Sequence, residues 1–168
     1  MSESSAKPNV YEALPQVRPE AIVLYCSDPR FQTAFEPFVE NGLGLPKGRY
    51  VPFVMAGGAG VLANPERLPK EFKFLRDRFE LFHEHFASLR RLVLINHEDC
   101  AYYRMLAQTV PGLQAHGSAS PHWPREDLPP IARTVHRLLG HLGWDSELYY
   151  ARFAAADRSH VTFDRVPL

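Results

Sequence analysis

The chain has 168 residues, of which 45% are hydrophobic and 23% charged, a composition typical of one ordinary water-soluble domain built on a single core. Nineteen Lys and Arg residues balance nineteen Asp and Glu residues, so a general affinity for nucleic acid or for an anionic membrane surface is not expected. No apolar run approaches the roughly 18 residues of a membrane span, and the first twenty residues contain no apolar signal region, so the expected location is the cytoplasm.

The first half of the chain is predicted to alternate strands with helices. Residues 1–20 hold three prolines and no sustained periodicity, which predicts an irregular N-terminal arm. Short apolar runs rich in strand-forming residues predict buried strands at Ala21–Cys26, Tyr50–Met55 and residues 92–96. Pro52 indicates that the second of these strands lies at a sheet edge. A weak helical pattern covers residues 31–40, and a glycine loop at 57–60 follows the second strand.

The clearest helical pattern covers residues 65–89, where apolar side chains recur at alternating spacings of three and four. Asp99 is placed to cap a further helix that ends near Thr109. Five prolines in residues 111–130 predict a long loop, in which His116 and His122 are candidate proton shuttles or plain surface groups. Helical spacing resumes over residues 128–142, and alternating patterns at 146–155 and 159–166 predict a terminal hairpin.

This order of elements predicts an α/β fold. We expect a mainly parallel sheet with strand order 2-1-3-4 and an antiparallel fifth strand, flanked by helices with right-handed crossovers. Residues 21–168 show no repeats and no second composition, so they are expected to form a single domain after the arm of residues 1–20.

Chemistry-bearing side chains gather at the exits of two predicted strands. Cys26 ends the first strand, and His97 and Cys100 directly follow the third. Ligands of open parallel sheets bind beyond the carboxyl ends of the strands at the point where the winding reverses, which falls between Cys26 and His97 if strand one lies between strands two and three. Two sulfur donors and one imidazole nitrogen suit zinc. With only two cysteines a disulfide framework is excluded, and reduced thiols in an intracellular setting are expected.

Asp28 and Arg30 extend this group of candidate ligands. Asp28 is two residues beyond Cys26 and is a candidate fourth zinc ligand, while Arg30 is placed to hold Asp28 by a bidentate ion pair. Two thiolates and one carboxylate carry three negative charges, which a zinc ion and Arg30 together offset. An aspartate that can leave the metal for Arg30 would close the site in one state and leave a place for water in the other.

The two segments together resemble the β-class carbonic anhydrases, in which Cys-x-Asp-x-Arg after a first strand is followed by His-x-x-Cys after a later one. Here they read Cys26-Ser-Asp28-Pro-Arg30 and His97-Glu-Asp-Cys100, and the order of elements from residue 21 to about 166 fits the same fold. The resemblance implies zinc on Cys26, His97 and Cys100, with Asp28 and Arg30 as the catalytic pair. It also implies an enzyme, a carbonate dehydratase-type lyase that reversibly hydrates carbon dioxide to bicarbonate.

The chain departs from the usual family pattern in the loop after the second strand. Family members usually carry Arg-Asn-Ala-Gly there, whereas residues 55–58 read Met-Ala-Gly-Gly, and Ala101 replaces the glycine that usually follows the second cysteine. The separation of Cys26 from His97 is also longer than usual. The altered loop leaves open a hydrolase of carbonyl sulfide or carbon disulfide on the same scaffold. A second alternative is a non-catalytic, zinc-stabilised binding protein, which would result if Asp28 stayed on the zinc without exchange.

The expected partner, besides a small-molecule substrate, is a second copy of the chain. The family's long N-terminal helices are reduced here to the short arm, and the sheet has a predicted edge at Pro52. We therefore expect a two-fold symmetric homodimer or a dimer of dimers.

Overall fold

A computed structural model describes residues 11–111, 113 and 123–168. It contains one five-stranded sheet in the order β2-β1-β3-β4-β5. The strands are β1 (Ala21–Cys26), β2 (Tyr50–Met55), β3 (Arg91–His97), β4 (Asp145–Phe153) and β5 (Val161–Val166). Neighbouring strands from β2 to β4 pair in parallel, and β5 pairs antiparallel with β4. The predicted fold class and strand order are thus confirmed.

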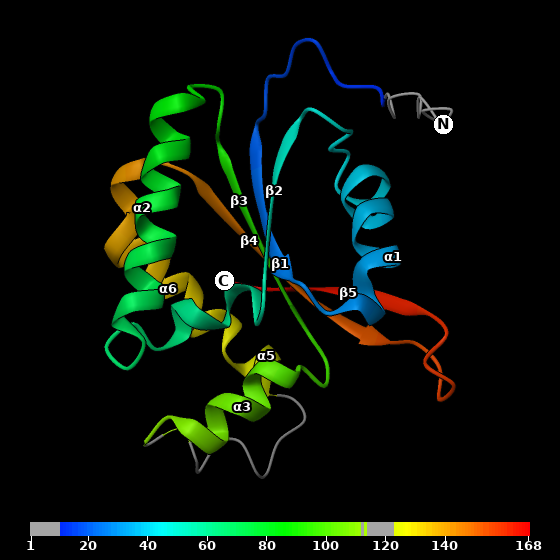
Figure 1. Ribbon diagram of the computed structural model, residues 1–168, viewed down its shortest axis with the longest axis vertical. Coiled ribbons are helices and arrows are strands. Elements are labelled where there is room, and N and C mark those ends of the chain that lie inside the picture. Colours follow the sequence, from blue (N-terminus) through cyan, green and yellow to red (C-terminus); the bar gives the residue numbers. More distant parts are fainter. Residues whose placement is uncertain (1–10, 112, 114–122) are drawn as a thin grey trace, which may run out of the picture.

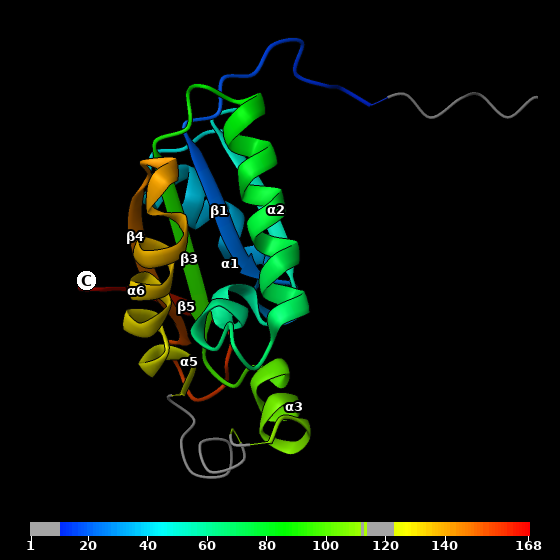
Figure 2. The same ribbon diagram turned by 90° about the vertical axis from the view of Figure 1, so that its left-hand side faces the viewer.

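Helices cover both faces of this sheet (Figures 1 and 2). They are α1 (Pro29–Pro37), α2 (Pro69–His85), α3 (Ala101–Thr109), α5 (Trp123–Glu126) and α6 (Leu128–Leu139), with shorter helical turns at Phe38–Gly42, Gly58–Ala63 and Gly140–Leu142. Helices α2 and α6 lie on one face and α1 on the other, whereas α3 and α5 lie beyond the end at which the parallel strands finish. No helix in the described part of the chain is long and apolar enough to cross a bilayer.

The two faces of the central strands build two separate cores, because successive side chains of a strand point to opposite sides. On β1, Ile22 and Leu24 pack with residues of α2 and α6, while Ala21, Val23 and Tyr25 pack with residues of α1. Every residue of β1 is buried, as expected for a strand between two parallel neighbours. This burial fixes the position of Cys26 at the end of the strand.

The helices differ from the prediction mainly at their ends. The pattern over residues 65–89 gives a helix only over Pro69–His85: Pro69 stands in its first turn, and the chain leaves the helical conformation at Phe86. Helix α1 begins at Pro29 rather than residue 31. Part of the predicted loop 111–130 is helical, since α5 and the start of α6 fall within it, and the candidate shuttles His116 and His122 lie outside the described residues.

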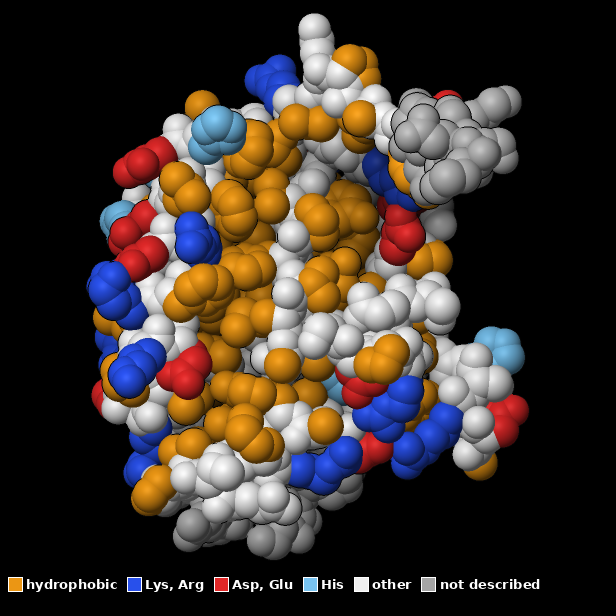
Figure 3. Space-filling model, in the orientation of Figure 1, with side chains coloured by type: hydrophobic (Ala, Val, Ile, Leu, Met, Phe, Trp, Pro, Cys, Tyr) orange, Lys and Arg blue, Asp and Glu red, His pale blue; other side chains and the backbone are white. Residues whose placement is uncertain are grey.

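Strand β2 lies at an edge of the sheet, as Pro52 indicated. The carbonyl groups of Arg49 and Met55 accept hydrogen bonds from residues next to or at the end of β1. Because backbone groups alternate sides along a strand, those of Tyr50, Pro52 and Val54 face outward, so the missing N–H of Pro52 costs the sheet no hydrogen bond. Apolar side chains flank this edge on both sides over a large part of the face in Figure 3.

Candidate metal centre

The sheet order brings the three sequence-predicted metal ligands together. Cys26 is the last residue of β1, His97 is the last residue of the adjacent β3, and Cys100 immediately precedes α3. Their ligand atoms, two Sγ and one imidazole nitrogen, all lie within 4.8 Å of one another. All three side chains are buried, with 4%, 1% and 4% of their surface exposed. The group could therefore hold one metal ion at the end of the sheet.

The imidazole of His97 is oriented for coordination through Nε2. Its Nδ1 lies 2.8 Å from the carbonyl oxygen of Glu98, a contact in which Nδ1–H is the donor. Nε2 is buried and has no hydrogen-bond partner among the described residues. The ring of Phe31 packs on the imidazole at 4.3 Å between centroids. A backbone carbonyl thus fixes the tautomer, leaving a buried lone pair for a metal.

The two cysteine sulfurs lie 3.9 Å apart and share a hydrogen bond. This bond from Cys100 lowers the pKa of the Cys26 thiol, against the effect of burial, with help from His97 and from the N–H of Gly57 at 3.3 Å. The same bond and burial raise the pKa of the Cys100 thiol, although N–H groups of the first turn of α3 act to lower it. Cys26 is therefore the thiol that loses its proton first. A bound cation would offset the repulsion between two thiolates and so allow Cys100 to lose its proton as well.

Glycines make the approach of the loop to Cys26 feasible. Gly57 has φ +82°, and a Cβ there would lie 2.1 Å from the ring of Tyr102. The next residue, Gly58, has φ +53° and passes directly over the ends of β1 and β3. The loop in which the sequence departs from Arg-Asn-Ala-Gly thus packs closely over the group formed by Cys26, His97 and Cys100, and the ring of Tyr102 packs on Gly57. Burial raises the pKa of Tyr102 to about 12.

Asp28 lies beside the three ligands but is held by Arg30. It caps α1 by accepting a hydrogen bond from the backbone N–H of Arg30 at 3.0 Å. The guanidinium donates to both of its carboxylate oxygens, from Nε at 3.0 Å and from Nη2 at 2.7 Å. These bonds hold the pKa of Asp28 below its usual range. One carboxylate oxygen lies 4.0 Å from His97 Nε2, so the carboxylate borders the metal group, and its role as a fourth ligand stays a prediction.

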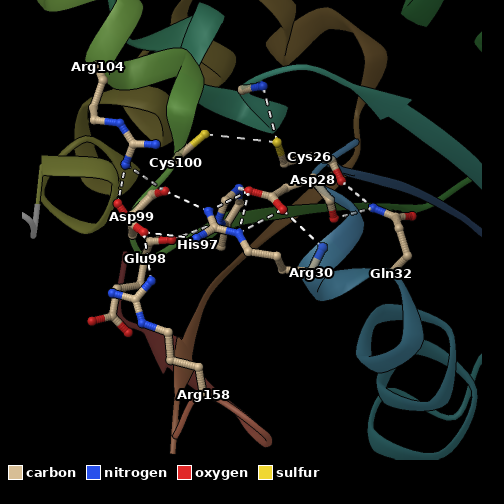
Figure 4. A network of polar contacts seen from close by, with 11 residues as sticks. Cys26, Asp28, Arg30, Gln32, His97, Glu98, Asp99, Cys100, Arg104 and Arg158 are labelled. Carbon is tan, nitrogen blue, oxygen red and sulfur yellow. Dashed lines mark hydrogen bonds and ion pairs between the residues drawn. The ribbon is translucent and has the colours of Figure 1, made fainter. Parts of the chain in front are cut away.

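Sequence reasoning assigned Asp99 the wrong role. Its backbone has φ +54°, and Cys100 rather than Asp99 occupies the cap position of α3. A left-handed residue cannot begin the helix, and its carboxylate faces outward to three arginines (Figure 4). Those arginines come from different elements: Arg30 from α1, Arg104 from α3 and Arg158 from the turn between β4 and β5. Spacing in the sequence carries no signal for this convergence.

Two further polar side chains brace the site. Gln32 donates from its amide to the carbonyl oxygens of Cys26 at 2.8 Å and Asp28 at 3.1 Å, which ties α1 to the end of β1. Glu98 accepts a hydrogen bond from the backbone N–H of Phe153 at 2.9 Å and so joins the ends of β3 and β4. Neither residue occupies a defining position of a motif, because each acts on backbone groups that only the folded sheet brings near.

The sequence matches no family model and no curated protein, but the fold has solved counterparts. The chain is similar to the β-carbonic anhydrase CafA of the fungal pathogen Aspergillus fumigatus, with 16% identity and a TM-score of 0.50, over 89% of this chain and 76% of that one. It also aligns with carbonic anhydrase from Glaciozyma antarctica, at 19% identity and a TM-score of 0.46, over 83% of this chain and 79% of that one. At such identities the first similarity establishes a shared fold, that of a β-carbonic anhydrase.

Proposed function

We propose that this chain is a zinc-dependent enzyme that reversibly hydrates carbon dioxide to bicarbonate, in the manner of a β-class carbonic anhydrase. The observation that carries the proposal is a buried Cys26–His97–Cys100 group with an ion-paired Asp28 at its border. The fold shared with a β-carbonic anhydrase supports it. The motif spacing that resembles the family supports it independently of the fold.

Cys26, His97 and Cys100 would hold the zinc ion, with Asp28 as the candidate fourth ligand. Two sulfur donors and one nitrogen donor match the preference of zinc, and the buried Nε2 of His97, which has no hydrogen-bond partner among the described residues, is free to bind a cation. When bound, zinc would supply a water whose pKa is lowered toward about 7 and would thus provide a nucleophile near neutral pH.

Asp28 would orient that nucleophile. Its lowered pKa keeps the carboxylate ionised near neutral pH, so it can accept a hydrogen bond from the attacking water but cannot donate one. The ion pair with Arg30 is the alternative to coordination of Asp28 to the metal. It holds one carboxylate oxygen of Asp28 4.0 Å from His97 Nε2, near the metal ligands. The reaction consumes one water and one carbon dioxide and yields bicarbonate and a proton, which must leave to solvent or buffer.

The proposed enzyme is cytoplasmic and forms a homodimer or a dimer of dimers. Two free, buried thiols that serve as metal ligands favour a reducing compartment. For assembly, β2 has no neighbour on its outer side in the described sheet, and its side chain Val54 and the nearby Phe74 of α2 are 42% and 46% exposed. An uncovered apolar strand edge of this kind favours pairing with an identical edge about a two-fold axis.

Stopped-flow measurement of carbon dioxide hydration by zinc-loaded protein tests the function. We expect activity well above background at pH 8.5, and Asp28→Asn should retain zinc while turnover falls by about 100-fold. A matched control is Asp164→Asn, because Asp164 is also paired with an arginine, Arg152 at 2.7 Å, but on the terminal hairpin. The control should keep wild-type activity.

The same samples separate the alternatives. Turnover of carbonyl sulfide or carbon disulfide without carbon dioxide hydration would replace the proposed substrate and keep the enzyme. A fully zinc-loaded wild type that turns over none of the three would refute the enzyme and leave a zinc-stabilised binding protein. Absence of bound zinc after purification and reconstitution would refute both.

A further inference from the structure

The guanidinium of Arg30 is held from two sides. Four of its five N–H groups have acceptors: Nε and one of Nη2 donate to Asp28, while Nη1 and the other of Nη2 donate to Asp99. The two bonds to Asp99 are each 2.8 Å long and reach a carboxylate oxygen and the backbone carbonyl oxygen. The planar guanidinium of Arg30 is therefore held between two acidic residues and has little freedom to rotate.

The backbone of Asp99 is shaped for this contact. Its φ of +54° lies in the left-handed region, which aspartate tolerates better than most residues because of its short polar side chain. In this conformation the carbonyl oxygen and the carboxylate point to the same guanidinium. The strain is located between two metal-ligand candidates, His97 and Cys100, where a regular helix start would otherwise be expected.

Two outer arginines hold Asp99 in turn. Arg104 donates to its carboxylate and, at 3.2 Å, to its carbonyl oxygen, and Arg158 donates to the carboxylate at 3.1 Å. Their side chains are 56% and 57% exposed, whereas that of Asp99 is 28% exposed, so each outer pair is screened by water and contributes little alone. The inner contact to Arg30 is the one that reaches the site.

We infer that Asp99 is a positioning residue: it fixes the Arg30 guanidinium so that Asp28 is held beside the metal ligands at one distance and in one orientation. This inference rests on the proposed function, because the orientation of Asp28 matters for turnover only in the enzyme. Groups that orient a reacting side chain in this way typically change activity by about 10- to 100-fold when they are removed.

A series at position 99 separates positioning from a backbone role. Glycine adopts φ +54° without strain, and asparagine keeps one oxygen acceptor and tolerates the same conformation. If Asp99 only shaped the turn, Asp99→Gly would match the wild type. If it positions Arg30, activity should decrease in the order Asp, Asn, Gly, with kcat/KM about 10-fold or more below wild type for Asp99→Gly and a smaller loss for Asp99→Asn.

The control variant is Arg158→Gly. Arg158 also has a positive φ, +58°, and it contacts Asp99 but not Arg30, so glycine preserves its turn. The substitution removes the outer contact with Asp99 and the cation–π contact with the ring of Phe153 at 5.1 Å. We expect its kcat/KM to stay within about twofold of wild type. Zinc content, measured on all variants, should equal that of wild type, because none of the substitutions removes a ligand.

Hydrogen exchange of the Arg30 Nε–H, followed by NMR, supplies a readout that does not depend on activity. The proposal predicts a protected signal in the wild type and faster exchange in Asp99→Gly, because the guanidinium then rotates more freely. Unchanged exchange and unchanged kcat/KM in Asp99→Gly would overturn the inference. If exchange is faster in Asp99→Gly but the wild type shows no hydratase activity, the proposed function is refuted while the contact between Asp99 and Arg30 stands.

Discussion

Replacement of Gly58 by alanine should lower the free energy of unfolding for two reasons, backbone strain and steric contact. Gly58 has φ +53°, and a Cβ there would lie 2.9 Å from the carbonyl oxygen of Ile95 and 3.0 Å from the backbone nitrogen of Cys26. Left-handed strain costs about 1 kcal/mol or more, and displacement of packed backbone costs about 2 kcal/mol more. We expect a loss of about 3 kcal/mol for Gly58→Ala.

Two other glycines separate these two effects. Gly143 has φ +68° but nothing within 4 Å of an added Cβ, so Gly143→Ala should show the strain alone, about 1 kcal/mol. Gly140 has open space and no positive φ, so Gly140→Ala should be neutral or stabilise by about 0.5 kcal/mol.

Urea unfolding followed by circular dichroism measures all three variants, in a chelator so that metal binding does not contribute. A Gly58→Ala variant about as stable as Gly143→Ala would refute the reasoning, because the contact with the two strand ends would then have no cost. A result near 3 kcal/mol would locate the tight packing over the metal group at Gly58.

The remaining predictions concern the metal and the assembly. Cys26→Ser should purify without zinc. Added zinc should raise the thermal midpoint of the wild type but not that of the variant, because a structural ligand couples metal binding to folding. Retention of one zinc per chain by the variant would contradict the ligand assignment. Val54→Lys should convert the expected dimer to a monomer in light scattering without changing the far-ultraviolet circular dichroism, because it places a charge on the outer edge of β2. A wild-type monomer at micromolar concentration would contradict the proposed interface.

The strands and the convergence of the three candidate ligands were predictable because local patterns determine them. The bounds of β1 and β2 coincide with apolar runs that contain no helical spacing, and Pro52 marked the edge because a residue without an N–H fits best where no neighbour needs one. Given the order of the strands, the convergence of Cys26 and His97 follows from the parallel arrangement of β1 and β3, whose carboxyl ends meet at the same edge of the sheet.

The ends of α2 were less predictable, because apolar spacing continues into segments that do not form helix. Leu68 and Leu89 are buried and continue the spacing of the stripe, yet they lie outside Pro69–His85. Apolar side chains are equally useful to a loop that packs on the core, so periodicity alone does not mark the helix boundary. At these two positions the apolar spacing indicates burial and not helix.

Asp99 shows where sequence reasoning fails for a physical reason. An aspartate before an apolar, helix-compatible segment is a good cap on local grounds, and the error arose because the tertiary structure offers its carboxylate a stronger set of donors. Partial burial acts to raise the pKa of Asp99, but Arg30, Arg104 and Arg158 outweigh it and hold the pKa below its usual range. Because these arginines come from three separate elements, their joint effect exists only in the folded chain. Local propensity was overridden at a residue that connects the outer arginines to the Asp28–Arg30 pair, as expected if helix capping is given up here to orient a functional group.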